Sequence, residues 1–196
     1  MTLQLVSIVL GLATLPLVLV VGFMFYVAIR YGPIISRIFE EKPLFLPLRV
    51  EPEPGGEDVR FRTEDGLELA GTYFKATGEG RVGVFVFCHE YLSNRWSCLP
   101  YTTELRRLGY DVFSFDFRSH GESDQEPRYR PLQWVTDHEL RDLRAALGYL
   151  RTRPDHDEAG FGLFGVSRGG STALVVAPGE ADVWGVITDG AFPTRG

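Results

Sequence analysis

One serine of the sequence, Ser167, lies between two glycines, in a pattern that can present a serine as a nucleophile. The segment Gly165-Val166-Ser167-Arg168-Gly169 lies between one apolar run and the start of another. A strand-to-helix turn of this kind is too tight for side chains at its flanking positions, so glycine is needed there. The turn raises the serine above the sheet edge, at the N-terminus of the next helix. We therefore interpret Ser167 as a candidate nucleophile toward an acyl carbonyl.

The oxyanion formed by such an attack needs hydrogen-bond donors, and the sequence offers two. The backbone N–H of Arg168 opens the helix after the serine, where the helix dipole favours negative charge. The second donor is expected from the N–H of Tyr91, in the loop "FCHEYLSNRWS". In this interpretation His89 braces the loop. The alternative is an ordinary core histidine with no role in the site.

A third polar cluster, "DFRSHGES", occupies residues 116–123. We expect Asp116 and Arg118 to pair and to hold this loop, because a carboxylate and a guanidinium form strong charge-assisted hydrogen bonds. Gly121 permits the turn. Asp116 and His120 stand four residues apart, which would also suit a catalytic acid–histidine pair.

These three motifs, in this order, resemble the α/β-hydrolase superfamily, most closely its monoacylglycerol-lipase and serine-aminopeptidase-like branch. Members carry an HG oxyanion motif, a D-x-R-G-H-G-x-S loop and the serine turn. The resemblance covers residues 58–196, with Glu90 and Ser119 standing where the motifs usually have glycine. It implies a serine hydrolase that acts on a carboxylic ester, lipid or peptide acyl substrate without metal or cofactor. It also implies that the loop containing His120 is a brace rather than a catalytic pair.

The partners of the serine are harder to find. The resemblance implies that an acid and then a histidine follow Ser167 along the chain, and Asp189 is the candidate acid. The four histidines all precede the serine, at positions 89, 120, 138 and 156. We therefore expect an incomplete gene product, a site completed by a second chain, or an inactive membrane-tethered binding or scaffold module. In each case this chain alone should have little or no activity.

The elements that would position these residues follow from the pattern of apolar residues. Alternating runs on both sides of Asp65-Gly66 predict an antiparallel hairpin. Strands are then expected at 81–89, 110–117, 160–167 and 183–190, and helices at 97–109, 131–153 and 168–177. This order predicts an α/β domain with a mostly parallel sheet, covered on both faces and truncated after its sixth strand. The open edge of the last strand predicts self-association or pairing with a completing chain.

The N-terminus predicts a membrane anchor. No charged residue occurs from Thr2 to Ile29, and about 20 apolar residues suffice to cross a bilayer. A secretory signal would have a basic start and a shorter apolar run, and a buried core helix is the other alternative. We expect a transmembrane helix at 1–30, a proline-rich linker at 31–57 and the α/β domain at 58–196. Basic residues after the span place the domain in the cytoplasm: Arg30, Arg37, Lys42 and Arg49.

The composition of the chain argues against some classes of binding partner. The net charge of −6 argues against nucleic acid, since phosphate binding needs a basic face. Cys88 and Cys98 are too few for a disulfide framework and are not spaced as zinc ligands, so two buried thiols are expected. The expected partners are a small-molecule or lipid acyl substrate and a membrane, with no cofactor.

Overall fold

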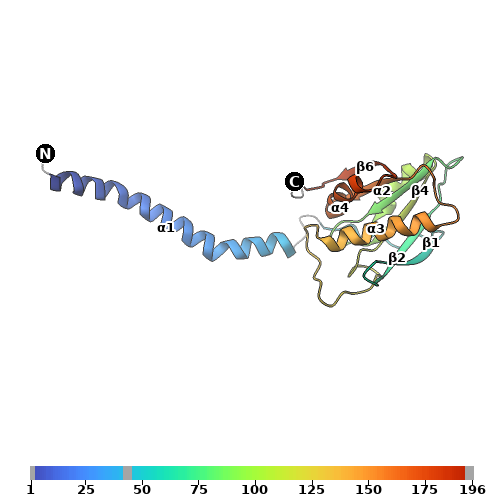
Figure 1. Cartoon of the computed structure of the whole chain (residues 1–196), viewed down its shortest axis with the longest axis horizontal. Coiled ribbons are helices and arrows are strands. Elements are labelled where there is room, and N and C mark those ends of the chain that lie inside the picture. The colour runs from blue at the N-terminus through green and yellow to red at the C-terminus, as the bar shows by residue number, and fades with distance from the viewer. Residues whose placement is uncertain (1–2, 42–45, 193–196) are drawn as a thin grey trace. The chain divides into compact units, whose positions relative to one another are not determined.

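The computed structural model describes residues 3–41 and 46–192. The chain divides into two compact units, Met1–Lys42 and Pro43–Gly196. The described part of the first unit is a helix, and the second unit contains a sheet with its covering helices, as Figure 1 shows.

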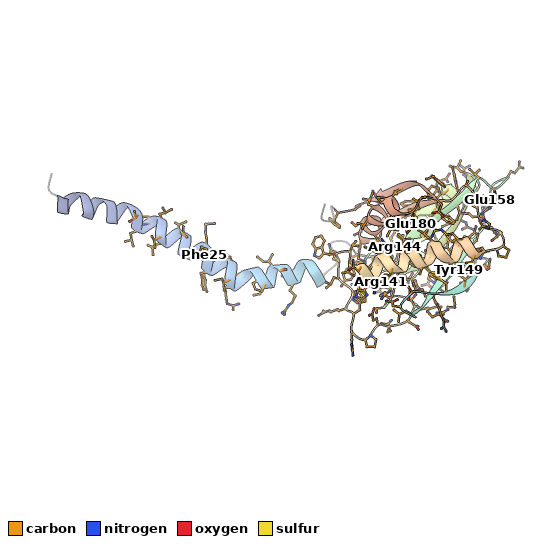
Figure 2. The ribbon with its side chains drawn as sticks, in the orientation of Figure 1. Phe25, Arg141, Arg144, Tyr149, Glu158 and Glu180 are labelled. Atoms are coloured by element: carbon orange, nitrogen blue, oxygen red, sulfur yellow. The ribbon has the colours of Figure 1, made fainter. Side chains whose placement is uncertain are left out.

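Helix α1 spans Leu3–Glu41, 39 residues. Its segment Thr14–Ile38 is predominantly apolar and is not buried within the protein. Phe25, labelled in Figure 2, is 65% exposed. The helix is therefore long and apolar enough to cross a membrane.

The end of α1 differs from the sequence expectation, which placed a helix at 1–30 and a linker from 31 onward. The helix continues for 11 residues beyond that boundary, through Pro33, to Glu41. A proline removes one backbone hydrogen bond and kinks a helix without having to end it. Figure 1 shows that α1 is bent along its length.

A six-stranded sheet organises the second unit within the described residues, in the order β1-β2-β4-β3-β5-β6. β2 pairs antiparallel with β1 and β4, and the other neighbours are parallel. The predicted mostly parallel sheet with an N-terminal antiparallel hairpin is therefore confirmed. The strands are β1 Glu57–Arg62, β2 Glu68–Phe74, β3 Gly83–Cys88, β4 Tyr110–Phe115, β5 Phe161–Val166 and β6 Val183–Asp189.

Among the residues that the structure describes, three α-helices cover this sheet: α2 Cys98–Arg107, α3 Asp137–Thr152 and α4 Arg168–Val176. Short 3-10 turns, η1 Arg95–Ser97 and η2 Ala177–Gly179, precede α2 and follow α4. α3 begins six residues after the predicted start at 131, because Thr136 caps it. The Thr136 N–H donates to Glu139 Oε2 at 2.8 Å, and the Thr136 hydroxyl accepts from the helix.

Two hydrophobic clusters fill the two sides of the sheet. On one side α3 and α4 contribute Leu143, Leu147 and Val176 to a cluster with Phe113. On the other side Cys98 of α2 packs against a cluster that includes Phe87 and Phe164. Figure 1 shows α3 lying across the near face of the sheet. Helices therefore cover both faces of the sheet, as the alternation of strands and helices predicts.

The start of the domain also differs from the expectation, which placed it at residue 58. Residues 46–56 belong to the second unit. The N–H of Leu48 donates to Glu90 Oε1 at 3.1 Å, and Arg106 forms an ion pair with Glu53 at 3.3 Å. Prolines made this stretch look like a free linker, but extended proline-containing chain can equally well pack along a domain surface.

Candidate active site

Ser167 lies in the turn between β5 and α4, in a strained backbone conformation. Its φ of 52° and ψ of −118° lie in a region that L-residues with side chains rarely adopt. A Cβ on Gly165 would lie 2.5 Å from the backbone of Gly169, and a Cβ on Gly169 would lie 2.0 Å from the carbonyl oxygen of Cys88. Both glycines are thus required by close backbone approach.

The parallel pairing of the strands brings the candidate residues to one sheet edge. In the register, Cys88 of β3 lies opposite Gly165 of β5, and Val166 lies opposite Asp189 of β6. The loop after β3, the serine turn and the end of β6 therefore meet. The N–H of Ser167 donates to the carbonyl oxygen of Asp189 at 2.7 Å.

A cavity of about 360 Å³ opens at this edge. Ser167 and Asp189 form part of its wall, and most of the remaining wall is apolar or aromatic. The lining residues are Leu46, Pro47, Leu48, Glu90, Tyr91, Tyr101, Gln133, Val166, Ser167, Asp189 and Gly190. An apolar pocket with a few polar groups is the usual form of a small-molecule site.

The two proposed oxyanion donors belong to elements beside this cavity. Arg168 is the first residue of α4, and the first N–H groups of a helix have no acceptor within it. Tyr91 lies in the wall of the cavity, and its hydroxyl donates to the carbonyl oxygen of Pro131 at 3.1 Å. Their role as oxyanion donors remains a prediction.

His89 is fully buried and hydrogen-bonded through both ring nitrogens. Its Nε2 accepts from the N–H of Phe117 at 3.2 Å, so Nδ1 carries the proton and donates to the carbonyl oxygen of Glu90 at 2.7 Å. Burial, together with the positive charge of Arg168, lowers the pKa of His89 to about 3, although the bond to the Glu90 carbonyl acts in the opposite direction. A neutral ring with both nitrogens occupied connects the loop after β3 with the loop after β4.

His120 and the Arg168 side chain form a second buried connection. Arg168 Nη2 donates to His120 Nε2 at 3.2 Å, and His120 Nδ1 donates to the carbonyl oxygen of Arg118 at 2.8 Å. Burial, together with the positive charge of Arg168, lowers the pKa of His120 well below its ordinary value. Arg168 is itself fully buried, and Nη1 lies 3.3 Å from Glu139 of α3.

The predicted pair of Asp116 with Arg118 is wrong. Asp116 accepts from the backbone N–H of Arg95 at 2.6 Å and from its guanidinium at 2.5 Å. The chain turns at Ser119, where φ is 59°, and Arg118 bonds instead to Asp142 of α3 at 2.7 Å. Each charge therefore ties the loop to a different neighbouring element.

The serine has no histidine beside it in the described part of the chain. His89 and His120 are held by the hydrogen bonds given above. His138 belongs to α3, and its Nδ1 lies 3.3 Å from Oε2 of Glu126. His156 is exposed in the turn after α3. Asp189 is exposed at the cavity wall, which leaves it open as a candidate acid.

Within residues 3–41 and 46–192, one group of potential metal ligands occurs, and none of its members lines the cavity. Oxygen and nitrogen atoms of Asp65, Glu126 and His138 lie within 4.8 Å of one another. The guanidinium of Arg118 occupies this position, with its Nη1 2.8 Å from both carboxylates and 3.0 Å from His138 Nδ1. A cationic side chain thus takes the place that a metal ion would need.

The sequence interpretation missed several residues of the cavity wall. Leu46, Pro47 and Leu48 line the cavity, although the prolines of this stretch predict a linker. Glu90 was treated only as a departure from a motif. Gln133 also lines the cavity, and its amide atoms are buried without a hydrogen-bond partner. The sequence signal that points to Glu90 is its position directly before Tyr91, the predicted oxyanion donor.

Known proteins are similar to this chain in sequence and in fold. Thiohydrolase aneE of Aspergillus aculeatus is 32% identical over 121 residues, which cover 61% of this chain and 36% of the relative. The uncharacterized protein YfhR of Escherichia coli O157:H7 is 30% identical over 148 residues, covering 72% and 49%. The chain thus spans half or less of the length of these relatives. No protein-family profile matches it.

Solved structures of hydrolases align with this chain. Esterase Pf2001 of Pyrococcus furiosus aligns with a TM-score of 0.62 and 27% identity, over 75% of this chain and 58% of the esterase. The α/β hydrolase GrgF of Penicillium sp. sh18 aligns with a TM-score of 0.58 and 26% identity, over 68% and 45%. The chain belongs to the α/β-hydrolase superfamily. Its placement in the monoacylglycerol-lipase and serine-aminopeptidase-like branch stays a prediction.

Proposed function

We propose that Ser167 is the nucleophile of an acyl hydrolase that acts on carboxylic esters or thioesters. The observation that carries the proposal is the strained conformation of Ser167, φ 52°, in a glycine-flanked turn on the wall of a largely apolar cavity. Backbone strain of this kind costs about 1–3 kcal/mol and persists where function requires it. The likeness to an esterase and to a thiohydrolase supports the same chemistry.

In the proposed reaction the Ser167 oxygen attacks the acyl carbon and forms a new carbon–oxygen bond. The backbone N–H groups of Arg168 and Tyr91 stabilise the oxyanion. The bond to the alcohol or thiol leaving group then breaks, and the leaving group departs with the proton that the serine loses. Water hydrolyses the acyl-serine and restores the hydroxyl. Asp189 is the candidate acid, and the base is none of His89, His120, His138 or His156.

We also infer that α1 anchors this domain to a membrane, on the strength of its length and its unburied apolar surface. The basic residues that follow the apolar run favour a cytoplasmic domain.

A reactive-serine test separates this proposal from an inactive binding or scaffold module. The full chain is incubated with excess fluorophosphonate, and the modified residue is located by mass spectrometry. We expect a slowly formed adduct at Ser167, which Ser167→Ala removes and Ser36→Ala retains. Turnover of a p-nitrophenyl ester should stay near the residual level of about 10³–10⁴ over water that a site without its base can supply. Absence of any Ser167 adduct would favour the inactive module.

A further inference from the structure

The segment Leu46–Val50, here called the strap, is fastened to the loop that follows β3. The N–H of Leu48 donates to Glu90 Oε1 at 3.1 Å, and its carbonyl oxygen accepts from the Ser93 hydroxyl at 3.4 Å. Both backbone groups of one strap residue are therefore held by residues within three positions of each other. The strap reaches the cavity wall through this attachment.

Glu90 is the central residue of the attachment. It is 8% exposed, and its second carboxylate oxygen, Oε2, accepts from the Ser97 hydroxyl at 3.1 Å. The carboxylate thus bridges the strap and the residue that precedes α2. A charged acceptor makes stronger hydrogen bonds than a neutral one. Glycine, which the resembling motif has at this position, could make neither side-chain bond.

The strap presents apolar side chains beside the nucleophile. Leu46, Pro47 and Leu48 line the same cavity as Ser167. Leu46 is 94% exposed and Leu48 is 43% exposed, so their apolar surface remains open to whatever enters. Covering such surface yields about 25 cal/mol per Å². A short acyl group adds little apolar surface to be covered, whereas a longer alkyl chain adds more.

We propose that the strap, held by Glu90, is a specificity element of the site that selects substrates with an extended apolar acyl group. The inference rests on the proposed role of Ser167. It assigns Glu90 as a positioning residue, which acts through the strap, and the strap leucines as the surface that contacts the acyl chain.

The test compares two alkyl fluorophosphonates, one with an ethyl and one with a dodecyl chain, on the full chain in a single detergent. In each reaction the Ser167 oxygen–phosphorus bond forms, the phosphorus–fluorine bond breaks, and fluoride and the serine proton leave to solvent. The readout is the ratio of dodecyl to ethyl labelling rates at Ser167. This ratio cancels changes in intrinsic serine reactivity, which a purely structural effect would alter equally for both probes.

Three variants and one control carry the test. Glu90→Ala removes both bonds, and Leu48→Asn keeps the backbone bonds but removes the apolar side chain. Each should lower the ratio about fivefold, the equivalent of roughly 1 kcal/mol. Glu90→Gln retains an acceptor for Leu48 and a group that can bond Ser97, so its ratio should stay within about twofold of wild type. Glu79→Ala, at an exposed glutamate, should change nothing.

An unchanged ratio in Leu48→Asn, with a thermal melt like that of wild type, would overturn the strap as a specificity element. This variant carries the test if Glu90→Ala does not fold. A ratio that falls equally in Glu90→Gln and Glu90→Ala would overturn the assignment of Glu90. Absence of labelling by both probes would instead overturn the role of Ser167, on which the inference rests.

Discussion

At the scale of single residues, the serine turn depends on the absence of a side chain at Gly169. A Cβ there would meet the carbonyl oxygens of Cys88 at 2.0 Å and His89 at 2.6 Å. Both neighbours are backbone atoms at the end of a central strand, so they cannot move aside as a flexible side chain would. The contact also fixes the distance between the nucleophile and the loop that holds Tyr91.

Gly169→Ala should therefore destabilise the domain by about 1–3 kcal/mol or more, because the added methyl overpacks a rigid junction. The matched control is Gly148→Ala in α3, where a Cβ meets nothing within 4 Å. Alanine in a helix interior is favoured over glycine by about 0.5–1 kcal/mol, so the control should be stabilised. Urea unfolding of both variants measures the difference. Equal stability of the two variants would contradict the close approach.

At the scale of elements, α1 and the strap follow one another along the chain but differ in their contacts. The segment Thr14–Ile38 is not buried within the protein, whereas the strap is hydrogen-bonded to the domain. An apolar helix surface of this length is stable where lipid covers it. The helix is therefore expected to be the part that binds a membrane.

Carbonate extraction tests this expectation. The full chain should remain in the membrane pellet, and a double variant with Leu19→Arg and Met24→Arg should be released. Each arginine near the centre of a span costs about 2.5–3.5 kcal/mol on insertion scales. Trp134→Arg, at an exposed residue of the domain, should leave the chain in the pellet. Release of the unaltered chain into the supernatant would rule out the anchor.

At the scale of the whole molecule, the two buried histidines make folding sensitive to mild acid. Burial holds the pKa of His89 at about 3 and that of His120 well below its ordinary value. Their pKa in the unfolded chain is about 6.5. Below that pH the unfolded state binds protons that the folded state cannot, so the free energy of unfolding falls as pH falls. The loss for His89 continues until the pH reaches about 3.

We predict a decline in stability between pH 7 and pH 5, by up to about 1.4 kcal/mol per pH unit for each histidine. Urea unfolding midpoints at pH 7.5, 6 and 5 measure it. His89→Asn should be less stable at pH 7.5 but should show a shallower decline, because one titrating group is gone. His156→Gln, which replaces an exposed histidine, is the matched control. A flat profile for the unaltered chain would show that the histidines are not buried in this way.

Much of the fold and part of the site could be predicted because their signals are local. Apolar periodicity identified the strands and helices, the Asp65-Gly66 turn identified the hairpin, and glycines around Ser167 identified the serine turn. Helix ends were less accurate. α1 continues past its expected end and through Pro33, and α3 begins later than expected because Thr136 caps it.

The partners of the charged and polar side chains were decided only by the tertiary structure. Asp116 bonds Arg95, 21 residues away, rather than its neighbour Arg118, and Leu48 bonds Glu90 across 42 residues. Residue types determine which pairs are chemically possible, but strand order and turn direction determine which atoms meet. For that reason the sequence by itself determined the nucleophile candidate and the sheet that carries it. Only the folded chain showed that the supposed linker forms a wall of the cavity.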